Sequence, residues 1–589
     1  MLIKSKFLRE DQSMNDPIIK INNLTYYYPK SELPALVNVN IEIRQGEFVV
    51  IAGSSGGGKS TLCRVLTGLI PHVYGGEIHG EVIINGINVI KEGPKSIVGI
   101  AGAVFQIPEN QLINLVVEEE LAFGLENLGI ESTIIWKRID EVVKALEIKH
   151  LRKRATTTLS GGEAQKVVIA SVIALKPKIL LLDEPLAHLD PSSSLELIHL
   201  LHKLNKKEGI TIIVFEHRLM DIIEYADRLV ILNKSVLADG CPKEVISELL
   251  NNTSNNIDIP ITAELSFKLG INNPTLTINE FISSFKSIIK NCNSKNSNYI
   301  NNEMCYNKDV NRKCRKDKVI IIRNLWHVYP NNRVALKDIN IEIERGRIVA
   351  IIGANGAGKT TLLKHLNGLL KPTRGKVIVN GFDTRDKTVA ELSKYVGIVF
   401  QNPLHQFFTE TVLEEAMVAA KIRGLQNVHK RAINMLKIFK LDHLIDKSPY
   451  ELSIGEQRRL AIASILIYDP PIIALDEPTA GLDRGLKNEL AKILKNLAKN
   501  GKTIIIATHD IDFLTRIHID KTIVMNDGKI VLQGSTRDVL YNHEILLKSR
   551  ITPPHIVELV KKLFSNIKVK PLNIDEALCL INMMRCKDV

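Results

Sequence analysis

One short glycine-rich stretch occurs twice in the chain, and this stretch decides the fold. It reads Gly53-Ser54-Ser55-Gly56-Gly57-Gly58-Lys59-Ser60-Thr61 in the first half and Gly353-Ala354-Asn355-Gly356-Ala357-Gly358-Lys359-Thr360-Thr361 in the second. Both fit a phosphate-binding loop, in which glycines let backbone N–H groups close around a polyphosphate while a lysine and a hydroxyl reach the outer phosphates and Mg²⁺. The sequence therefore predicts two nucleotide-binding sites.

The surroundings of each loop support this prediction. An apolar run precedes each loop, at 48–52 and 348–352, and is typical of a buried parallel strand. A helix-like segment follows, at 61–66 and 361–366, so that its N-terminus would face the phosphates. A glycine-rich turn without function is the alternative for a single match, but two matches between a strand and a helix favour nucleotide binding.

Composition bounds the remaining possibilities. The 589 residues are 45% hydrophobic and 24% charged, which is typical of a soluble globular protein of more than one domain. No apolar stretch approaches the roughly 20 residues that span a bilayer, and charges interrupt the start of the chain, so we expect no signal peptide and a cytoplasmic protein. The seven cysteines indicate reduced thiols. A net charge of +12 would suit nucleic acid or an anionic membrane, but phosphate ligands and a lysine-rich composition explain it as well.

Four further motifs recur in the same order in both halves. They are a glutamine-containing loop, a Leu-Ser-x-Gly-Glu turn before a helix, an apolar strand that ends in Asp-Glu, and an apolar strand that ends in histidine. The pairs are Phe105-Gln106-Ile107-Pro108-Glu109-Asn110-Gln111 with Phe400-Gln401-Asn402-Pro403-Leu404-His405-Gln406, Leu159-Ser160-Gly161-Gly162-Glu163 with Leu452-Ser453-Ile454-Gly455-Glu456, Asp183-Glu184 with Asp476-Glu477, and His217 with His509. Asp190 and Asp483 follow in matching loops. The chain is therefore a duplicated domain.

The spacing of the motifs divides the chain as follows. We predict a loose N-terminal segment (1–16), a first nucleotide-binding domain (17–255) with a C-terminal extension (256–290), a flexible linker rich in Asn, Lys and Ser (291–317), a second domain (318–545) and its extension (546–589).

A tyrosine lies at nearly the same distance before each phosphate loop. Tyr28 and Tyr329 could each stack on an adenine ring, which is worth ~1–3 kcal/mol by analogy with base–aromatic stacking. A tyrosine that simply packs in the core is the alternative for each residue.

This set of motifs resembles the ATP-binding cassette (ABC) ATPases over nearly the whole chain, twice. The resemblance implies an α/β fold with two tandem phosphate-loop domains, each with a mainly parallel core sheet, an antiparallel β subdomain and a helical subdomain. The Gln-x-Pro-x-x-Gln form of the glutamine loop, the segment 117–124 and the tails at 274–280 and 571–576 are similar to the energy-coupling factor branch of vitamin and metal-ion importers. ATP and Mg²⁺ are the cofactors that the family implies.

The resemblance also implies roles for individual residues. The phosphate loops and Tyr28 and Tyr329 would bind ATP, Lys59 and Lys359 its outer phosphates, and Glu184 and Glu477 would be the general bases. Mg²⁺ would be held by Ser60, Thr360, Asp183 and Asp476 together with Gln106 and Gln401, and the γ-phosphate would be sensed by His217, His509 and the same two glutamines. The second glutamines of the loops, Gln111 and Gln406, would shape the groove for the coupling helices of a membrane subunit.

In the family, the signature motif of one domain closes over the ATP of the other domain. Ser453 and Gly455 would then complete the site of Lys59, and Ser160 and Gly162 the site of Lys359, so that the two domains form an intramolecular pair. Both motifs end in Glu where Gln is usual, and Ile454 replaces a glycine. A β-branched residue there cannot adopt glycine-only dihedrals and adds bulk, which predicts slower hydrolysis at the Lys59 site.

The resemblance leads to one main function and two alternatives. The main expectation is an ATPase on the cytoplasmic side of the cell membrane that energises an importer of a vitamin or a transition-metal ion. Its partners would be a membrane-spanning coupling subunit and a substrate-binding membrane subunit, without nucleic acid. The first alternative is a soluble tandem ATPase that acts on ribosomes or nucleic acid, which the positive charge would suit. A nucleotide-binding regulator without turnover is disfavoured because both glutamates are present.

Overall fold

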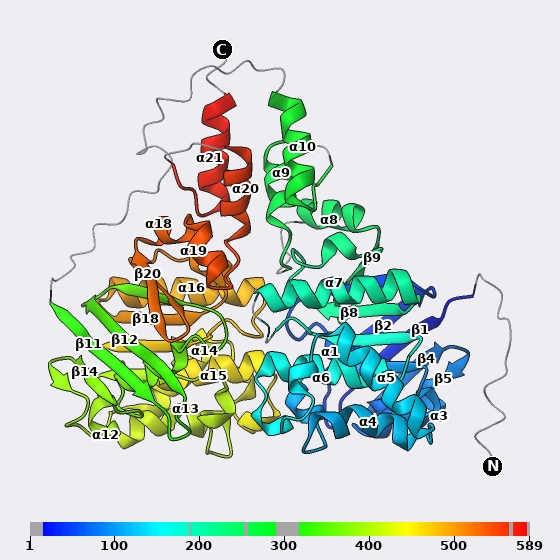
Figure 1. The fold of residues 1–589 in the computed structure, drawn as a ribbon, viewed down its shortest axis with the longest axis horizontal. Helices are drawn as coiled ribbons and strands as arrows, with labels where there is room; N and C mark the ends of the chain where they lie inside the picture. The colour runs from blue at the N-terminus through cyan, green and yellow to red at the C-terminus, as the bar shows by residue number, and fades with distance from the viewer. Residues whose placement is uncertain are drawn as a thin grey trace. The chain divides into compact units, whose positions relative to one another are not determined.

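The computed structural model describes residues 16–187, 189, 191–252, 257–271, 273–289, 317–564 and 569–585. The chain forms two compact units, of which the first comprises most of residues 16–277 and the second most of residues 278–585 (Figure 1). Asp190, the N-terminal segment before Asp16 and the linker before Asp317 lie outside the described residues. The domain boundaries given above stay a prediction.

Each unit is built on a six-stranded core sheet. The strand order is β10-β9-β3-β8-β7-β6 in the first unit and β20-β19-β13-β18-β17-β16 in the second, and every neighbouring pair is parallel except the outermost β9/β10 and β19/β20. The strands are β3 (Phe48–Ala52), β6 (Ala101–Val104), β7 (Ile179–Asp183), β8 (Thr211–Glu216), β9 (Arg228–Asn233), β10 (Ser235–Gly240), β13 (Ile348–Ile352), β16 (Val396–Val399), β17 (Ile472–Asp476), β18 (Thr503–Thr508), β19 (Lys521–Asn526) and β20 (Lys529–Gly534).

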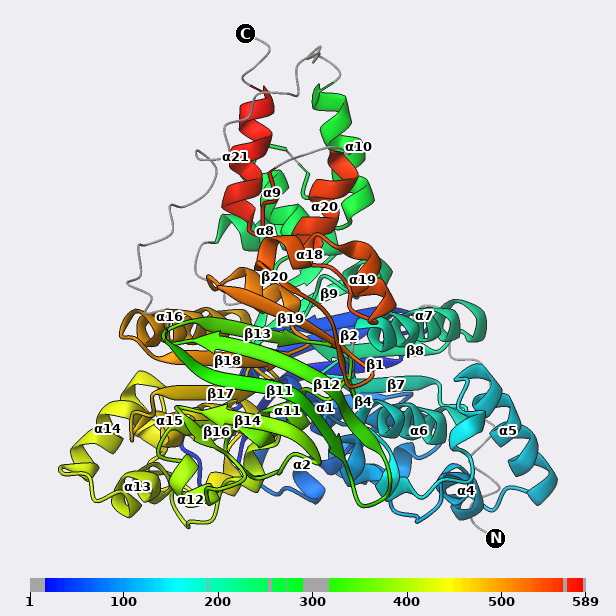
Figure 2. The same cartoon turned by 60° about the vertical axis from the view of Figure 1, so that its left-hand side comes forward.

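A four-stranded antiparallel sheet accompanies each core sheet, in the order β2-β1-β4-β5 or β12-β11-β14-β15. Its strands are β1 (Ile19–Tyr27), β2 (Leu36–Ile43), β4 (Glu77–Ile84), β5 (Ile87–Asn88), β11 (Lys318–Val328), β12 (Val334–Glu344), β14 (Arg374–Val379) and β15 (Phe382–Asp383). Figure 2 shows this sheet of the second unit with β11, β12 and β14 labelled. Ile320 and Ile322 of the sheet share one apolar cluster with Ile351 of the core sheet. Burial of alternate residues therefore fastens the two sheets together.

Helices complete both units. The helices that follow the phosphate loops are α1 (Lys59–Leu66) and α11 (Lys359–Leu366), and the helical subdomains are α4 (Val117–Asn127), α5 (Ser132–Ala145) and α6 (Gly161–Ala174), and α13 (Val412–Ile422), α14 (Val428–Ile438) and α15 (Ile454–Leu466). The long helices of the core are α7 (Pro191–Glu208) and α16 (Arg484–Lys499). The segments after the last strands form α8 (Pro242–Asn251), α9 (Ile261–Lys268), α10 (Ile278–Ile289), α18 (Thr536–Leu540), α19 (His543–Lys548), α20 (His555–Leu563) and α21 (Ile574–Arg585), and short helices lie at α2 (Leu69–His72), α3 (Val89–Glu92), α12 (Val389–Leu392) and α17 (Ile511–Thr515).

This architecture confirms the predicted α/β fold class of two tandem domains, each with a mainly parallel core sheet, an antiparallel sheet and a group of helices. The two strands that we expected to precede the phosphate loops are β3 and β13. Each coincides at both ends with its apolar run, at 48–52 and 348–352. None of the helices that the structure describes is long and apolar enough to span a bilayer.

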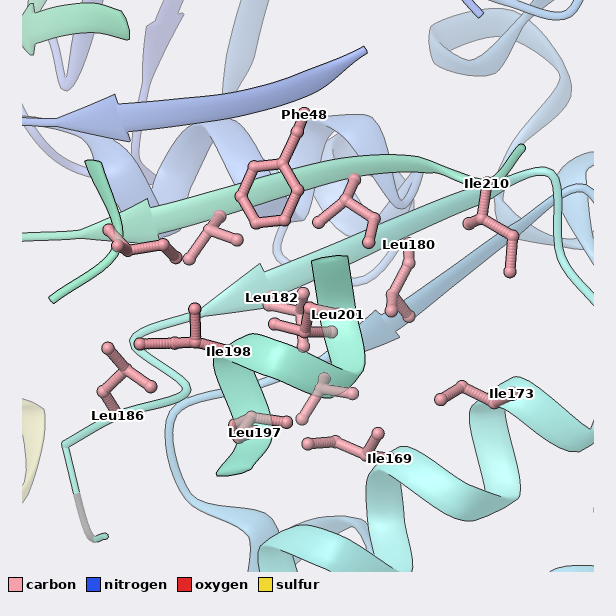
Figure 3. Packing of buried hydrophobic residues seen from close by; sticks show 14 of the residues in the cluster. Phe48, Ile169, Ile173, Leu180, Leu182, Leu186, Leu197, Ile198, Leu201 and Ile210 are labelled. Atoms are coloured by element: carbon pink, nitrogen blue, oxygen red, sulfur yellow. The ribbon is translucent and has the colours of Figure 1, made fainter. Parts of the chain in front are cut away.

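The helices α6 and α7 cover one face of the first core sheet (Figure 3). Leu180 and Leu182 of β7 meet Leu201 of α7, and Ile169 and Ile173 of α6 close the same cluster. All but Ile173 have almost no exposed surface. Because β7 ends at Asp183 and Glu184 follows directly, this packing helps to hold both carboxylates at the end of the strand.

Leu201→Ala tests this packing. Deleting a fully buried leucine leaves a cavity, so we expect a loss of about 2–5 kcal/mol in the unfolding free energy of the first unit. Leu195, on the same helix, is 40% exposed, and Leu195→Ala should change stability by less than about 0.5 kcal/mol. Denaturant unfolding of the full chain measures both, and equal effects of the two substitutions would contradict the described packing.

Candidate functional site

The two phosphate loops lie between β3 and α1 and between β13 and α11, where the core strands end. Gly58 and Gly358, the residues before the helices, have φ angles of 93° and 101°. A Cβ atom at either position would lie 2.8 Å from the carbonyl oxygen of Ala35 or Ala335. Both the dihedral angle and the space therefore require glycine.

The loop lysines are held inside their loops. The Nζ atom of Lys59 donates hydrogen bonds to the carbonyl oxygens of Gly53 and Ser54 at 2.8 and 3.0 Å. Lys359 donates to the two corresponding carbonyls at 2.8 and 3.2 Å. Both lysines are buried. Each ammonium group therefore lies inside its loop, at the place where a polyphosphate would bind.

The next residue of each loop is bonded to the first carboxylate of the Asp-Glu pair. Ser60 Oγ donates to Asp183 at 3.1 Å, and Thr360 Oγ1 donates to Asp476 at 2.6 Å. Burial, reinforced by repulsion from the neighbouring glutamate, raises the pKa of Asp183 to about 7. The same two causes raise the pKa of Asp476 to about 6, although its hydrogen bond to Thr360 works in the opposite direction.

This donor set fits Mg²⁺. Hydroxyl and carboxylate oxygens are the ligands that a hard cation prefers, and a cation beside the aspartates would favour their charged forms. Oδ1 of Asp476 is buried and has no hydrogen-bond partner in the described part of the chain. No group of three His, Cys, Asp or Glu side chains among the described residues could hold a metal ion by itself, so the cation would share the loop hydroxyl and phosphate oxygens. When bound, Mg²⁺ neutralises negative charge on the outer phosphates.

The second carboxylates occupy a strained position. Glu184 and Glu477 have φ angles of 47° and 48°, a region that non-glycine residues rarely adopt. Burial would raise the pKa of both carboxyls, but the nearby histidine and loop lysine outweigh it and lower each pKa to about 2. Both carboxylates are therefore charged at neutral pH.

The histidines directly follow the neighbouring strand in each unit, β8 or β18. His217 Nδ1 lies 3.6 Å from Glu184, whereas His509 Nδ1 lies 2.9 Å from Glu477. Lys359 Nζ is also 3.5 Å from Glu477. The lysine, acidic pair and histidine of each unit thus meet at one strand edge, as the sequence predicted.

The glutamine loops reach the same edge. Gln106 Nε2 donates to Glu184 at 2.5 Å, and Gln401 lines one pocket with Glu477. The second glutamines bind their own loops: Gln111 bonds the backbone at 103 and 105, and Gln406 the backbone at 398 and 400. These latter bonds fix the shape of each loop.

The predicted adenine-stacking tyrosines lie close to the phosphate loops. The hydroxyl groups of Tyr28 and Tyr329 are each 3.1 Å from the Oγ1 of Thr61 or Thr361. An aromatic ring two residues earlier supports each tyrosine edge-on: Tyr26 in the first unit, with ring centroids 4.9 Å apart, and His327 in the second, at 4.7 Å. A stacking role for the two tyrosines stays a prediction.

Helix capping explains why each signature motif ends in glutamate where glutamine is usual. Ser160 caps helix α6 and Ser453 caps helix α15, and in both a capping box joins the serine to the glutamate three residues on. Glutamate and glutamine both complete such a box. Gly162 leaves room for Leu189, since a Cβ there would lie 3.2 Å from that side chain, and Gly455 is buried in α15.

One argument about Ile454 is corrected by the structure. We expected glycine-only dihedrals at this position, but Gly161 and Ile454 are the first residues of α6 and α15, and neither has a positive φ. Bulk is the remaining difference: a Cβ on Gly481 would lie 3.2 Å from Ile454 Cγ2. The slower hydrolysis at the Lys59 site and the pairing of each signature motif with the opposite loop stay predictions.

The second unit contains a pocket of 580 Å³ over its phosphate loop. The lining includes Tyr329, Lys359, Thr360, Gln401 and Glu477, which the sequence predicted, and Arg333, Lys337 and Asp527, which it did not. A Cβ on Gly356 would lie 3.8 Å from Arg333 Nη2.

A comparison of the two halves could have revealed Arg333. Gly58 and Gly358 face Leu36 and Leu336 in the same way, and counting back from these leucines pairs Arg333 with Leu33, in a turn that is one residue longer in the first unit. Leu33 is 72% exposed, so the first unit has an exposed apolar side chain where the second has a cation beside the phosphate loop.

Comparisons with known proteins agree with this geometry. The ABC transporter family matches residues 36–187 and 336–480. An ABC transporter ATP-binding protein of Caldanaerobacter subterraneus subsp. tengcongensis is 38% identical, over 94% of this chain and 97% of its own length. A Bacillus subtilis protein that bears the name HMP/thiamine import ATP-binding protein YkoD is 32% identical, over 92% of this chain and 96% of its own. The archaeal ribosome recycling factor aABCE1, solved with ribosomal stalk protein aP1, is 22% identical with a TM-score of 0.56, over 89% of this chain and 92% of its own, and this likeness shows the fold alone.

The chain therefore belongs to the ABC transporter family, as a tandem ATP-binding protein. It is an ATPase, and ATP and Mg²⁺ are its ligands. The roles of individual residues in the two sites are proposals that the following substitutions test.

Glu184→Gln with Glu477→Gln tests the general bases. A positioned base typically accelerates a reaction ~10²–10⁴-fold, so we expect hydrolysis to fall by this factor while ATP binding is kept. Phosphate release and equilibrium binding measure the two effects. The matched control is Glu42→Gln with Glu342→Gln, an exposed and a half-buried carboxylate at corresponding strand positions, which pair with Lys20 and with Lys318 and Arg323, respectively. Wild-type hydrolysis in the Glu184/Glu477 variant would refute the assignment.

Arg333→Leu installs the residue of the first unit in the second. One hydrogen bond between charged groups at a partly exposed site is worth about 1 kcal/mol, so we expect about fivefold weaker ATP binding at the second site. Calorimetric titration in a Lys59→Ala background isolates that site. Arg323→Leu, which removes an exposed arginine outside the pocket lining, should leave the affinity unchanged, and an equal effect of both substitutions would show that Arg333 has no specific contact.

Proposed function

We propose that this chain is the ATPase subunit of an energy-coupling factor type importer of a vitamin or a transition-metal ion, on the cytoplasmic side of the cell membrane. Its partners are a membrane-spanning coupling subunit and a substrate-binding membrane subunit. The observation that supports this best is an exposed apolar side chain presented by each glutamine loop.

A buried glutamate builds each of these loops. Glu120 is 5% exposed and accepts the backbone N–H groups of Ile113 and Asn114 at 2.9 and 2.8 Å. Glu415, which is 3% exposed, accepts the N–H groups of Phe408 and Thr409 at 3.1 and 3.2 Å. These hydrogen bonds and those of Gln111 and Gln406 hold both loops in a fixed conformation, so the surface of each loop is preformed.

The loops hold their apolar side chains in solvent. Ile113 is 68% exposed and Phe408 is 69% exposed, at corresponding positions. Such side chains on a rigid loop are suited to a partner surface, and a short helix of a membrane subunit would cover them. Because Gln106, in the same loop, is bonded to Glu184, a partner at Ile113 would be linked mechanically to the catalytic carboxylate.

The relatives favour a function in import, and they favour a vitamin as the imported substrate. The Bacillus subtilis relative named for HMP/thiamine import aligns with nearly the whole of both chains. The tandem ATPase that acts on ribosomes or nucleic acid is supported only by a fold likeness.

In the proposed reaction, the chain positions ATP and the attacking water. The phosphate-loop amides and the lysines bind the outer phosphates, the tyrosines stack on adenine, and a glutamate removes the proton of the water. The histidines and first glutamines contact the γ-phosphate, so that its loss changes the glutamine loops. The residues are Lys59, Tyr28, Glu184, His217 and Gln106 in the first unit and Lys359, Tyr329, Glu477, His509 and Gln401 in the second.

Affinity capture of the tagged chain from detergent-solubilised membranes of its own host tests the importer. We expect a multi-span protein and a small membrane protein to come with it, and the ligand of the small protein identifies the cargo. Ile113→Ser with Phe408→Ser should abolish this capture, because it removes the apolar contacts of both loops.

Leu237→Ser with Val531→Ser is the matched control. These residues are 48% and 41% exposed, at corresponding positions of β10 and β20, and their loss should leave the capture intact. Recovery of ribosomes or nucleic acid without a membrane protein would replace the importer with the tandem ATPase of soluble targets. Both outcomes are independent of the substitutions at the ATP sites.

A further inference from the structure

The two units differ at the residue before the histidine. Strand β8 ends at Glu216, and strand β18 ends at Thr508. Glu216 pairs with Ala52 and Thr508 with Ile352, the last residues of the strands before the phosphate loops. Both side chains have no exposed surface. The same point of the fold therefore contains a carboxylate in one site and a hydroxyl in the other.

In the first unit, Glu216 binds the turn that contains the histidine. Its Oε1 accepts the backbone N–H groups of His217 at 2.9 Å and Arg218 at 3.2 Å, and it lies 3.2 Å from His217 Nδ1. Its Oε2 is buried and accepts no hydrogen bond from any residue that the structure describes. Burying a carboxylate completely costs free energy unless the group is well paired. A buried threonine hydroxyl does not carry this cost, so the presence of Glu216 needs an explanation.

In the second unit, the histidine depends on the proposed base instead. The N–H group of His509 donates to the carboxylate of Glu477 at 3.1 and 3.2 Å, and Nδ1 lies 2.9 Å from it. Thr508 donates to the same carboxylate at 2.9 Å. One glutamate thus holds the histidine and is also placed to accept a proton.

The first unit divides these two tasks. His217 is nearer to Glu216, at 3.2 Å, than to Glu184, at 3.6 Å. Glu184 accepts a short hydrogen bond from Gln106. A carboxylate at Nδ1 also favours the tautomer in which Nδ1 bears the hydrogen, which leaves Nε2 for another partner.

We propose that Glu216 is a positioning residue of the first ATP site, which anchors His217 independently of Glu184 and leaves Glu184 to the glutamine loop. The inference rests on the roles proposed above for Glu184 and His217. The two sites would then respond differently to movement of the glutamine loop. In the first site, His217 keeps its position when Glu184 moves with the loop. In the second site, His509 moves together with Glu477.

The test uses the full chain with Glu477→Gln, which silences the second site. Glu216→Ala removes the anchor, and Glu216→Asp keeps the charge but shortens its reach. Because the histidine acts on the reacting phosphate, we expect both to lower kcat by about tenfold or more, with KM for ATP within about twofold. Glu216→Gln keeps an oxygen that accepts the two N–H groups, and its kcat should stay within about threefold of the parent.

Other results would overturn the proposal. These are a kcat within about twofold of the parent for Glu216→Asp, an equal loss in Glu216→Gln, or a change in KM alone. If Glu216→Ala does not fold, Glu216→Asp and Glu216→Gln decide the question. Failure of the underlying roles is recognised separately, because the Glu184→Gln, Glu477→Gln variant would then keep its activity with Glu216 intact.

Discussion

The parallel pairing of the central strands is the constraint on which both sites depend. In a parallel sheet, the carboxyl ends of neighbouring strands meet at one edge. The pairs Ala52↔Glu216 and Asp183↔Phe215 bring the strands of the phosphate loop, the acidic pair and the histidine to one level. Residues far apart in sequence therefore come within hydrogen-bond distance, and a shift of one residue would point them to the opposite face.

The sequence predicted this edge well because its motifs are local. Apolar runs that are followed by the phosphate loop, by Asp-Glu or by His indicate both the strand and its end, and β3 and β13 begin and end with those runs. The histidines were predicted from the family resemblance, and the structure adds their contacts with Glu184 and Glu477. The same approach failed at Ile454, because the argument considered the residue type alone, whereas the Ser-x-x-Glu spacing of the capping box indicates that a helix begins at that position.

Other features could not be predicted because they depend on contacts between distant segments. Arg333 belongs to no motif, and only the alignment of the strand hairpins places it over the second phosphate loop. Glu216 was read as part of an apolar strand with a histidine at its end, and its burial and its bonds to the following turn become visible only in three dimensions. In both cases, a residue-by-residue comparison of the two halves was the available signal, because each differs from its counterpart in charge.

Charge explains why the differences between the halves matter. The first site contains three buried carboxylates, Asp183, Glu184 and Glu216, of which the last two flank His217, and ATP would bring further negative charge. In the second site, Thr508 takes the place of the third carboxylate, and Arg333 adds a cation. Repulsion between like charges is strong in a buried environment, so the additional carboxylate of the first site and the additional cation of the second change the local charge in opposite directions. Two domains with one fold and one set of motifs are thereby given different electrostatic environments for the same ligand.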